Sequence, residues 1–318
     1  MKAVSRFAPS PTGRLHPGHA WSAIQAHDRA ADGRFILRIE DIDGTRSRRE
    51  FVAGIFEDLA WLGLRWEEPV LFQSTRLHAY AAALDRLKAM NLLYPCFCTR
   101  AEIAASLSAP HRAAPVYPGT CRHRGEEERG RRMTEERYAW RLDMARAIAT
   151  LSASPAKAGA QVRNASGRML HAVAPTSEAG PRPSPGKSRL TWHDEIAGDV
   201  LATPEIHGDV ILARKDAPAS YHLAVTIDDA AQGITHVVRG RDLFDATHVH
   251  RLLQALLDLP TPVYRHHALL LDDTGERLAK RNGAPTLDAL RSAGVDGLVL
   301  AADLRQGRLP IGFRCAEA

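Results

Sequence analysis

The sequence predicts an α/β protein built on a parallel sheet. Short apolar and β-branched runs alternate with segments of helical periodicity at both ends of the 318-residue chain. Strand, loop, helix and strand follow one another in the arrangement that starts a parallel sheet. Hydrophobic residues make up 45% of the chain, which is enough to bury a substantial core in one large domain or two ordinary ones.

The first part of the chain begins with one such unit. Residues 4–8 form an apolar run, residues 20–31 have helical composition, and residues 35–39 form a β-branched run after a turn. Apolar residues then recur at helical spacing over residues 50–62 and 77–93. We expect strands in the first and third segments and helices in the others.

The pattern returns in the second part of the chain. Residues 209–213, 221–227 and 236–240 predict strands, and residues 246–257 predict an amphipathic helix. A short strand is expected at residues 268–271, before a turn. The α/β organisation is therefore interrupted and then resumed.

The interruption has two parts of different composition. Residues 96–133 are rich in Pro, Arg, His and Cys, whereas residues 145–190 consist largely of Ala, Ser, Pro and Gly. The second composition is typical of a linker or a surface insertion. This segment could be a solvated, disordered loop or a basic tail that faces RNA, and its basic residues are Lys157, Arg163, Arg168, Arg182, Lys187 and Arg189.

The overall charge mildly favours a polyanionic partner. Lys and Arg number 42 against 37 Asp and Glu, which gives a formal net charge of +5 and a pI near 9.2. No apolar run approaches the length of a membrane span, and the first residues do not form a signal peptide. We expect a cytoplasmic protein with no membrane partner, and a monomer because nothing in the sequence demands a second subunit.

Three of the four cysteines lie close together and suggest a metal site. Cys96, Cys98 and Cys121 are too few for a disulfide framework, and a cytoplasmic compartment is reducing. Three thiolates with one nitrogen or oxygen donor make a closed tetrahedral zinc site. His111 and His123 are available as fourth donors by general chemistry. The alternative is a set of buried or free thiols.

The opening stretch RFAPSPTGRLHPGHAW carries a candidate phosphate site. His16-Pro17-Gly18-His19 lies where a loop enters the first helix. Exposed N–H groups and the positive end of the helix dipole favour phosphate there, and Gly18 lets a ligand approach the backbone. Two imidazoles three residues apart could donate to phosphate oxygens. A loop whose histidines only cap the helix is the alternative.

Four motifs in a fixed order resemble a known catalytic core. They are RFAPSPTGRLHPGHA near the start, RIEDID at residues 38–43, VVRGRDL at residues 237–243 and RLAKR at residues 277–281. In this order they resemble the glutamate-type class I aminoacyl-tRNA synthetases. The residues from His16 to His19 match the HIGH motif of that family, and residues 277–281 match its KMSKS loop.

The resemblance implies a Rossmann-type parallel sheet with insertions. It places the two halves of the catalytic domain at residues 1–95 and 191–260, a zinc-bearing insertion at 96–144, a flexible insertion at 145–190, and the KMSKS loop with a short helical, stem-contact-like region at 261–318. No anticodon-binding domain is expected.

The resemblance also implies a reaction and its residues. Glutamate is activated by ATP, accompanied by Mg²⁺, to glutamyl-adenylate and then passes to RNA. The catalytic residues expected are His16, His19 and Lys280, and Gly18 joins them in binding ATP. The glutamate-binding positions are Arg6, Phe7, Ala8, Pro9, Ser10, Glu40, Tyr221 and Arg239. Arg6 and Arg239 suit forked contacts to a carboxylate, Glu40 suits the ammonium group, and the Tyr221 hydroxyl closes the pocket.

The cysteine pattern matches one branch of the family. C-x-C followed by Y-x-x-x-C resembles a zinc pattern in which the tyrosine completes the site, so Cys96, Cys98, Tyr117 and Cys121 are expected to hold one structural Zn²⁺. His123 is the rival fourth ligand. The RLAKR loop departs from the family pattern at Arg277 and Ala279 but keeps Lys280.

The short stretch after the KMSKS-like loop favours a particular acceptor. The branch with this length and this cysteine pattern, the glutamyl-Q tRNA(Asp) synthetases, attaches glutamate to the base queuosine in the anticodon loop of tRNA(Asp). The alternatives are a minimal glutamyl-tRNA synthetase that charges a tRNA 3′ end and a catalytically silent RNA-binding paralogue.

Overall fold

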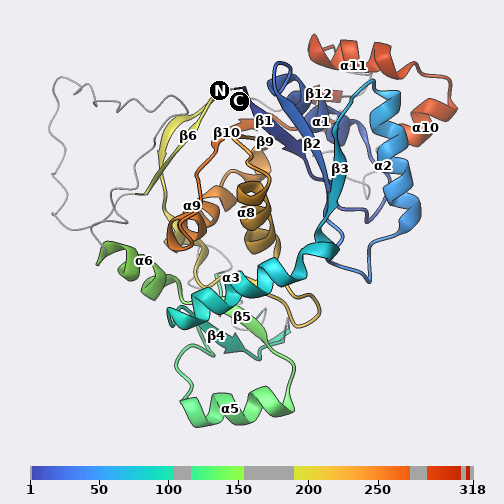
Figure 1. The fold of residues 1–318 in the computed structure, drawn as a ribbon. Helices are drawn as coiled ribbons and strands as arrows, with labels where there is room; N and C mark the ends of the chain where they lie inside the picture. The colour runs from blue at the N-terminus through green and yellow to red at the C-terminus, as the bar shows by residue number, and fades with distance from the viewer. Residues whose placement is uncertain are drawn as a thin grey trace, which may run out of the picture.

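A central parallel sheet organises the molecule (Figure 1). The computed structural model describes residues 2–99, 101–103, 116–153, 190–272, 285–308 and 313–315. Strands β1 (Val4–Phe7), β2 (Arg34–Ile39) and β3 (Glu67–Phe72) pair in parallel. Strand β10 (Val263–His267) pairs in parallel with β9 (His236–Gly240) and β6 (Thr191–Asp194), and β7 (Gly198–Leu201) forms an antiparallel edge.

The two sets of strands meet between β1 and β9. The amide of Thr235 donates to the carbonyl of Val4 at 3.0 Å, and the amide of Val4 donates to the Thr235 hydroxyl at 2.8 Å. Strands far apart in the sequence thus lie side by side, as Figure 1 shows. The chain leaves β1 toward β2 on one side, whereas β9 and β10 extend the sheet on the other. Such a reversal leaves a crevice at the carboxyl ends of the strands, where α/β proteins bind ligands.

Helices cover this sheet and supply most of the core. Helix α1 (Pro17–Arg29) follows β1 and buries Ala20, Ala23, Ile24 and Ala26. Helix α2 is Arg49–Trp61, α3 is Leu77–Ala89, α8 is Tyr221–Ala231 and α9 is Ala246–Leu256. Apolar side chains of α3, α8 and α9 share one cluster, which also includes helix α6 (Met144–Ser152). The same cluster includes Leu142, Leu212 and Ala213 from two further strands.

Residues 221–227 form a helix, so the expectation of a strand there is wrong. Helix α8 begins at Tyr221 and buries Leu223, Ala224, Val225 and Thr226 in succession. A helix buried on nearly every face shows no 3.6-residue period, and its β-branched residues imitate a strand. The error matters because this helix also carries Asp229, which pairs with Arg6 of the candidate site.

Three strands from separate parts of the chain build a small second sheet. Strands β4 (Leu93–Cys96), β5 (Ala139–Leu142) and β8 (Ile211–Ala213) pair antiparallel in the order β4-β5-β8. The strand expected at residues 209–213 therefore exists as β8 but lies outside the parallel sheet. Helix α5 (Glu126–Glu135) projects from this region (Figure 1).

The end of the chain is helical. Helices α10 (Leu287–Ser292) and α11 (Gly297–Arg305) pack near α1 and α2, and β11 (Leu270–Asp272) pairs antiparallel with β12 (Phe313–Cys315). Residues 145–152 belong to α6, and residues 154–189 lie outside the described residues. Among the residues described, no helix has both the length and the apolar character needed to cross a bilayer.

Candidate active site

A cavity of about 300 Å³ lies at the carboxyl ends of β1, β2 and β9. All the sequence-predicted ligand-binding residues that the structure describes line it. They are Arg6, Phe7, Ala8, Pro9, Ser10, His16, Gly18, His19, Glu40, Tyr221 and Arg239. Lys280, the remaining predicted residue, lies outside the described residues, as do Arg277 and Ala279. The cavity thus brings together residues separated by more than half the chain.

Arg239 enters this cavity from β9 and is held by hydroxyl and imidazole groups. Its Nη1 donates to the Tyr221 hydroxyl at 3.1 Å, its Nη2 to the Thr247 hydroxyl at 2.6 Å, and its Nε to Nε2 of His266 at 3.0 Å. The side chain is buried. Within the described part of the chain, no carboxylate forms an ion pair with it. A buried charge in this state favours an anionic ligand.

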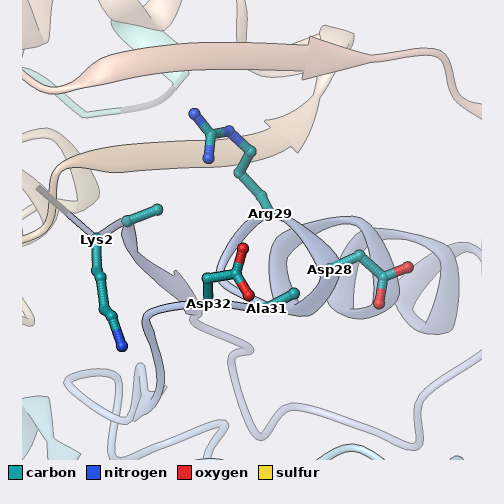
Figure 2. A pocket seen from close by; sticks show the side chains of 6 residues that line it. Lys2, Asp28, Arg29, Ala31 and Asp32 are labelled. Carbon is teal, nitrogen blue, oxygen red and sulfur yellow. The ribbon is translucent and has the colours of Figure 1, made fainter.

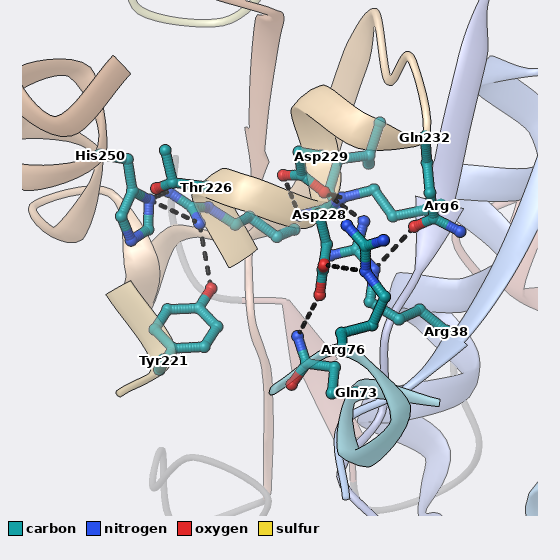
Figure 3. A network of polar contacts seen from close by, with 12 residues as sticks. Arg6, Arg38, Gln73, Arg76, Tyr221, Thr226, Asp228, Asp229, Gln232 and His250 are labelled. Carbon is teal, nitrogen blue, oxygen red and sulfur yellow. Dashed lines mark hydrogen bonds and ion pairs between the residues drawn. The ribbon is translucent and has the colours of Figure 1, made fainter. Parts of the chain in front are cut away.

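Arg6 differs because it is already paired. Its Nε and Nη2 donate to the two carboxylate oxygens of Asp229 at 2.9 and 3.4 Å, and Arg38 donates to the same carboxylate at 2.6 Å (Figure 3). Burial opposes ionisation of Asp229, but the two guanidinium groups outweigh it and hold its pKa below the ordinary value. Asp229 takes one edge of the Arg6 guanidinium, so a ligand carboxylate would meet the Nη1–Nη2 edge.

Glu40 provides the carboxyl group of the cavity. Its backbone amide donates to the Pro9 carbonyl at 3.1 Å, which ties the end of β2 to the opening loop, and the Ser10 hydroxyl lies 3.4 Å from its Oε2. Burial raises the pKa of Glu40 to about 7, although Arg38 and Arg6 act in the opposite direction. A cationic group bound beside it would restore the ionised form.

His16 and His19 form a reciprocal cap at the start of α1. The amide of Gly18 donates to Nδ1 of His16 at 3.1 Å, and the amide of His16 donates to Nδ1 of His19 at 3.2 Å. The capping interpretation of the loop is confirmed, and it does not compete with phosphate binding. Because both Nδ1 atoms accept, a neutral ring carries its proton on Nε2, and the cap fixes that tautomer.

Sequence reasoning missed some residues that line the cavity and one that pairs with a lining residue. Asp229 pairs with an arginine 223 positions earlier, and no local pattern announces such a pair. Trp21 and His267 also line the cavity, and the Trp21 indole donates to the carbonyl of Ala268 at 3.1 Å. Asp242, another lining residue, stands within the VVRGRDL motif, so the motif itself could have indicated it.

The predicted metal ligands also come together. The sulfur atoms of Cys96, Cys98 and Cys121 all lie within 4.8 Å of one another. The Tyr117 hydroxyl lies 3.4 Å from Cys96 Sγ and 3.5 Å from Cys98 Sγ, and the sulfurs of Cys98 and Cys121 are 3.5 Å apart. Zinc bonds of about 2.3 Å to sulfur and about 2.0–2.2 Å to oxygen place tetrahedral ligands about 3.5–3.8 Å apart. The spacing fits that ion.

Of the candidate fourth donors, Tyr117 lies beside the sulfur atoms of this cluster. Tyr117 is buried, whereas His123 is exposed and is not among the described residues that gather at the cluster. His111 lies outside the described residues. The guanidinium carbon of Arg141 stands 3.7 Å from the centre of the Tyr117 ring, so the ring is held by a cation–π contact.

A second hollow, of about 620 Å³, lies at the opposite, amino-terminal ends of the strands. Lys2, Asp28, Arg29 and Asp32 line it, and Figure 2 shows that these side chains point in different directions. Arg29 already pairs with Glu195 at 2.8 Å, and Asp28 with Arg305 at 2.9 Å. Its charged groups do not converge on a ligand.

Comparison with known proteins defines the class first. Residues 2–154 and 183–306 match the family model of the class I tRNA synthetases for glutamate and glutamine, catalytic domain. Glutamate–tRNA ligases from Elizabethkingia meningosepticum, solved in complex with its amino acid, and from Elizabethkingia anophelis superpose on this chain with TM-scores of 0.66 and 0.65 at 26% identity. Each alignment covers 89% of this chain and 53% of the other, so the chain spans about half the length of these structures.

Sequence relatives define a narrower group. A glutamyl-Q tRNA(Asp) synthetase of Rhodobacter capsulatus is 44% identical over 95% of this chain and 98% of its own length. Proteins of the same name from Symbiobacterium thermophilum and Nitratidesulfovibrio vulgaris are 40% and 39% identical, each over 91% of this chain and 81% of the relative. The chain therefore belongs to the class I tRNA synthetases for glutamate and glutamine, and within them to the glutamyl-Q tRNA(Asp) synthetase family.

Proposed function

We propose that the protein activates L-glutamate with ATP and transfers it to the queuosine base in the anticodon loop of tRNA(Asp). The observation that carries the activation step is the cavity in which Arg239, Glu40 and the capped start of α1 converge. The choice of queuosine as the acceptor is supported by the names of relatives whose alignments cover nearly the whole chain.

The charges of the cavity complement glutamate. The guanidinium groups of Arg6 and Arg38 share the carboxylate of Asp229, whereas Arg239 forms no ion pair with a carboxylate among the described residues. Glutamate carries two carboxylates and one ammonium group. Arg239 and the Nη edge of Arg6 hold carboxylate oxygens, Glu40 holds the ammonium group, and the hydroxyl of Tyr221 completes the pocket.

The opening loop and α1 bind ATP. The Nε2–H groups of His16 and His19 donate to phosphate oxygens, and Gly18 keeps the backbone open to the ligand beside the positive end of the helix dipole. A carboxylate oxygen of glutamate attacks the α-phosphorus, and pyrophosphate leaves. The ammonium group of Lys280 stabilises the negative charge that develops on the leaving pyrophosphate. Mg²⁺ bound with ATP neutralises part of the phosphate charge.

The second step consumes the adenylate. A hydroxyl of the queuosine cyclopentenediol ring attacks the activated carbonyl, an ester bond forms, and AMP leaves with the electron pair of the broken mixed anhydride. The protein contributes position, because the bound adenylate holds its carbonyl at the mouth of a cavity formed by the strand ends.

A structural zinc ion belongs to the same proposal. One Zn²⁺ per chain is held by Cys96, Cys98, Tyr117 and Cys121, whose spacing fits a tetrahedral site. When bound, the ion crosslinks the turn around Tyr117 to the end of β4 and does no chemistry on the substrates.

The test is transfer of labelled glutamate. Purified protein receives ATP, Mg²⁺ and labelled glutamate with tRNA(Asp) that contains queuosine or lacks it. We expect label only on the queuosine-containing tRNA. Equal label on both forms would show charging of a 3′ end instead, and the absence of any glutamate-dependent exchange between ATP and pyrophosphate would indicate a silent RNA-binding protein.

A further inference from the structure

Arg239 is supported by a buried chain of groups behind the cavity. Nε2 of His266 accepts from Arg239 Nε at 3.0 Å, and Nδ1 of His266 lies 2.7 Å from Oδ2 of Asp194. All three side chains are buried, and those of His266 and Asp194 are each only 1% exposed. The chain runs from β9 through β10 to β6, across neighbouring strands of the sheet.

Only one arrangement of protons satisfies these contacts. The single N–H of Arg239 Nε must donate, so Nε2 of His266 carries no proton and Nδ1 donates to Asp194. Burial, together with the neighbouring Arg239 cation, lowers the pKa of His266 to about 4, which agrees with a neutral ring. The other imidazole near Arg239 is that of His250, with Nδ1 at 3.4 Å from Nη1 and Nη2.

Asp194 is fixed as a carboxylate by donors on both oxygens. Its Oδ1 accepts from the amides of Ile196 and Ala197, each at 2.9 Å, and its Oδ2 accepts from the amide of His266 at 3.1 Å as well as from the ring. Burial opposes ionisation, but these donors hold its pKa below the ordinary value. Each of these contacts requires a carboxylate oxygen of Asp194 to accept a hydrogen bond.

The imidazole of His266 therefore lies between Arg239 and the carboxylate of Asp194. Arg6 shows the opposite case, because Asp229 contacts it directly and takes up its Nε–Nη2 edge. Among the described residues, the groups that bond Arg239 are neutral, namely the Tyr221 and Thr247 hydroxyls, the Leu243 carbonyl and the imidazoles of His250 and His266. The guanidinium is held in one orientation while its charge stays available to a ligand.

We propose that Asp194 and His266 are positioning residues that orient Arg239 and keep its charge available for a carboxylate of glutamate. This inference rests on the proposed function, since it assigns a substrate carboxylate to Arg239. Neither residue lines the cavity. They therefore act through Arg239 and not by contact with substrate.

The test compares two variants of His266 with a matched histidine. H266E places a carboxylate directly against Arg239, and H266Q keeps an acceptor of similar reach without the charge. His248 serves as the control, because it is buried and packs edge-on against Trp192 as His266 does, but it bonds the amide of Thr203 and not Arg239. KM for glutamate, KM for ATP and kcat are measured by exchange between ATP and pyrophosphate.

The expected result is selective. H266E should raise KM for glutamate about 100-fold and H266Q about three- to tenfold, with KM for ATP within about twofold in both. H248Q should leave both KM values unchanged. An unchanged KM for glutamate in H266E, or an equal rise of both KM values, would overturn the inference. Should H266E fail to fold, a folded H266Q with the kinetics of H248Q would overturn it equally. Absence of exchange in the wild-type protein would instead refute the proposed function.

Discussion

At the residue scale, the two arginines of the cavity differ in whether a carboxylate pairs with them. Arg6 is paired with Asp229, whereas Arg239 is surrounded by neutral acceptors. The sequence predicted both as carboxylate ligands from their motifs, and it placed them together correctly. It could not predict the difference, because Asp229 and His266 reach these arginines from distant segments.

Removing the charge of Arg239 should weaken glutamate binding specifically. R239Q leaves a buried, partly satisfied amide where a carboxylate would bind, so KM for glutamate should rise about 10- to 100-fold while KM for ATP changes little. R265Q is the matched control on β10, since Arg265 pairs with Glu195 away from the cavity. Steady-state exchange kinetics measure both constants. Equal KM values for glutamate in the two variants would contradict the role of Arg239.

The carboxyl group of Glu40 should make glutamate binding depend on pH. Burial raises its pKa to about 7, although the cations of Arg38 and Arg6 act to lower it. The group is therefore mostly protonated below pH 7 and mostly ionised above it. An ammonium ion binds the ionised form. KM for glutamate should therefore rise about tenfold from pH 8 to pH 6.

E40Q provides the control for that dependence. It should bind glutamate more weakly, with a KM that no longer changes between pH 6 and pH 8. KM for ATP, measured over the same range, reports any titration elsewhere. A glutamate KM in the wild-type protein that is flat from pH 8 to pH 6 would remove Glu40 from the ammonium site.

At the element scale, the start of α1 combines a structural and a functional role in the same side chains. His16 and His19 cap the helix through Nδ1 and present Nε2 on the other side of each ring. The HPGH pattern predicted the position of this helix start. Helix α8 was not predicted, because complete burial hides the helical period, and for the same reason the polar contacts of Asp228 and Asp229, drawn in Figure 3, were not predicted.

Two substitutions at His16 should separate the two roles. H16N retains a good capping residue and should keep the stability of the protein but lose most of its activation rate, about 10²-fold or more. H16A should lose the rate and about 1 kcal/mol of stability. D143A, which removes the cap of α6 that bonds the Arg146 amide, should lose similar stability with full activity. Thermal unfolding and exchange rates measure both; an active H16N would contradict the assignment.

At the scale of the whole molecule, the cysteine cluster is tied to the catalytic half. Arg122, next to Cys121, pairs with Asp209 at 3.1 Å, and Lys215 donates to the carbonyl of Phe97 at 2.5 Å. Spacing in the sequence predicted the three thiols as a group. The choice of Tyr117 over His123 came from resemblance alone, since an exposed and a buried side chain are indistinguishable in a loop without regular periodicity.

Metal content should follow the four donors. Protein never exposed to chelator should contain about one zinc per chain, and Y117F should bind zinc about 10- to 100-fold more weakly, by analogy with the loss of other supporting groups at metal sites. H123A is the control and should retain wild-type zinc. Chelator competition with metal analysis measures the affinities. A zinc-free H123A beside a fully loaded Y117F would reverse the assignment of the fourth ligand.

The central claim concerns the nucleoside that receives glutamate. Queuosine-containing tRNA(Asp) is incubated with protein, ATP, Mg²⁺ and labelled glutamate, then digested to nucleosides under mildly acidic conditions that preserve the ester, and the products are separated with mass detection. The account predicts that the label travels with a glutamylated queuosine nucleoside and that the 3′-terminal adenosine carries none. Label on the terminal adenosine, with queuosine unmodified, would contradict it.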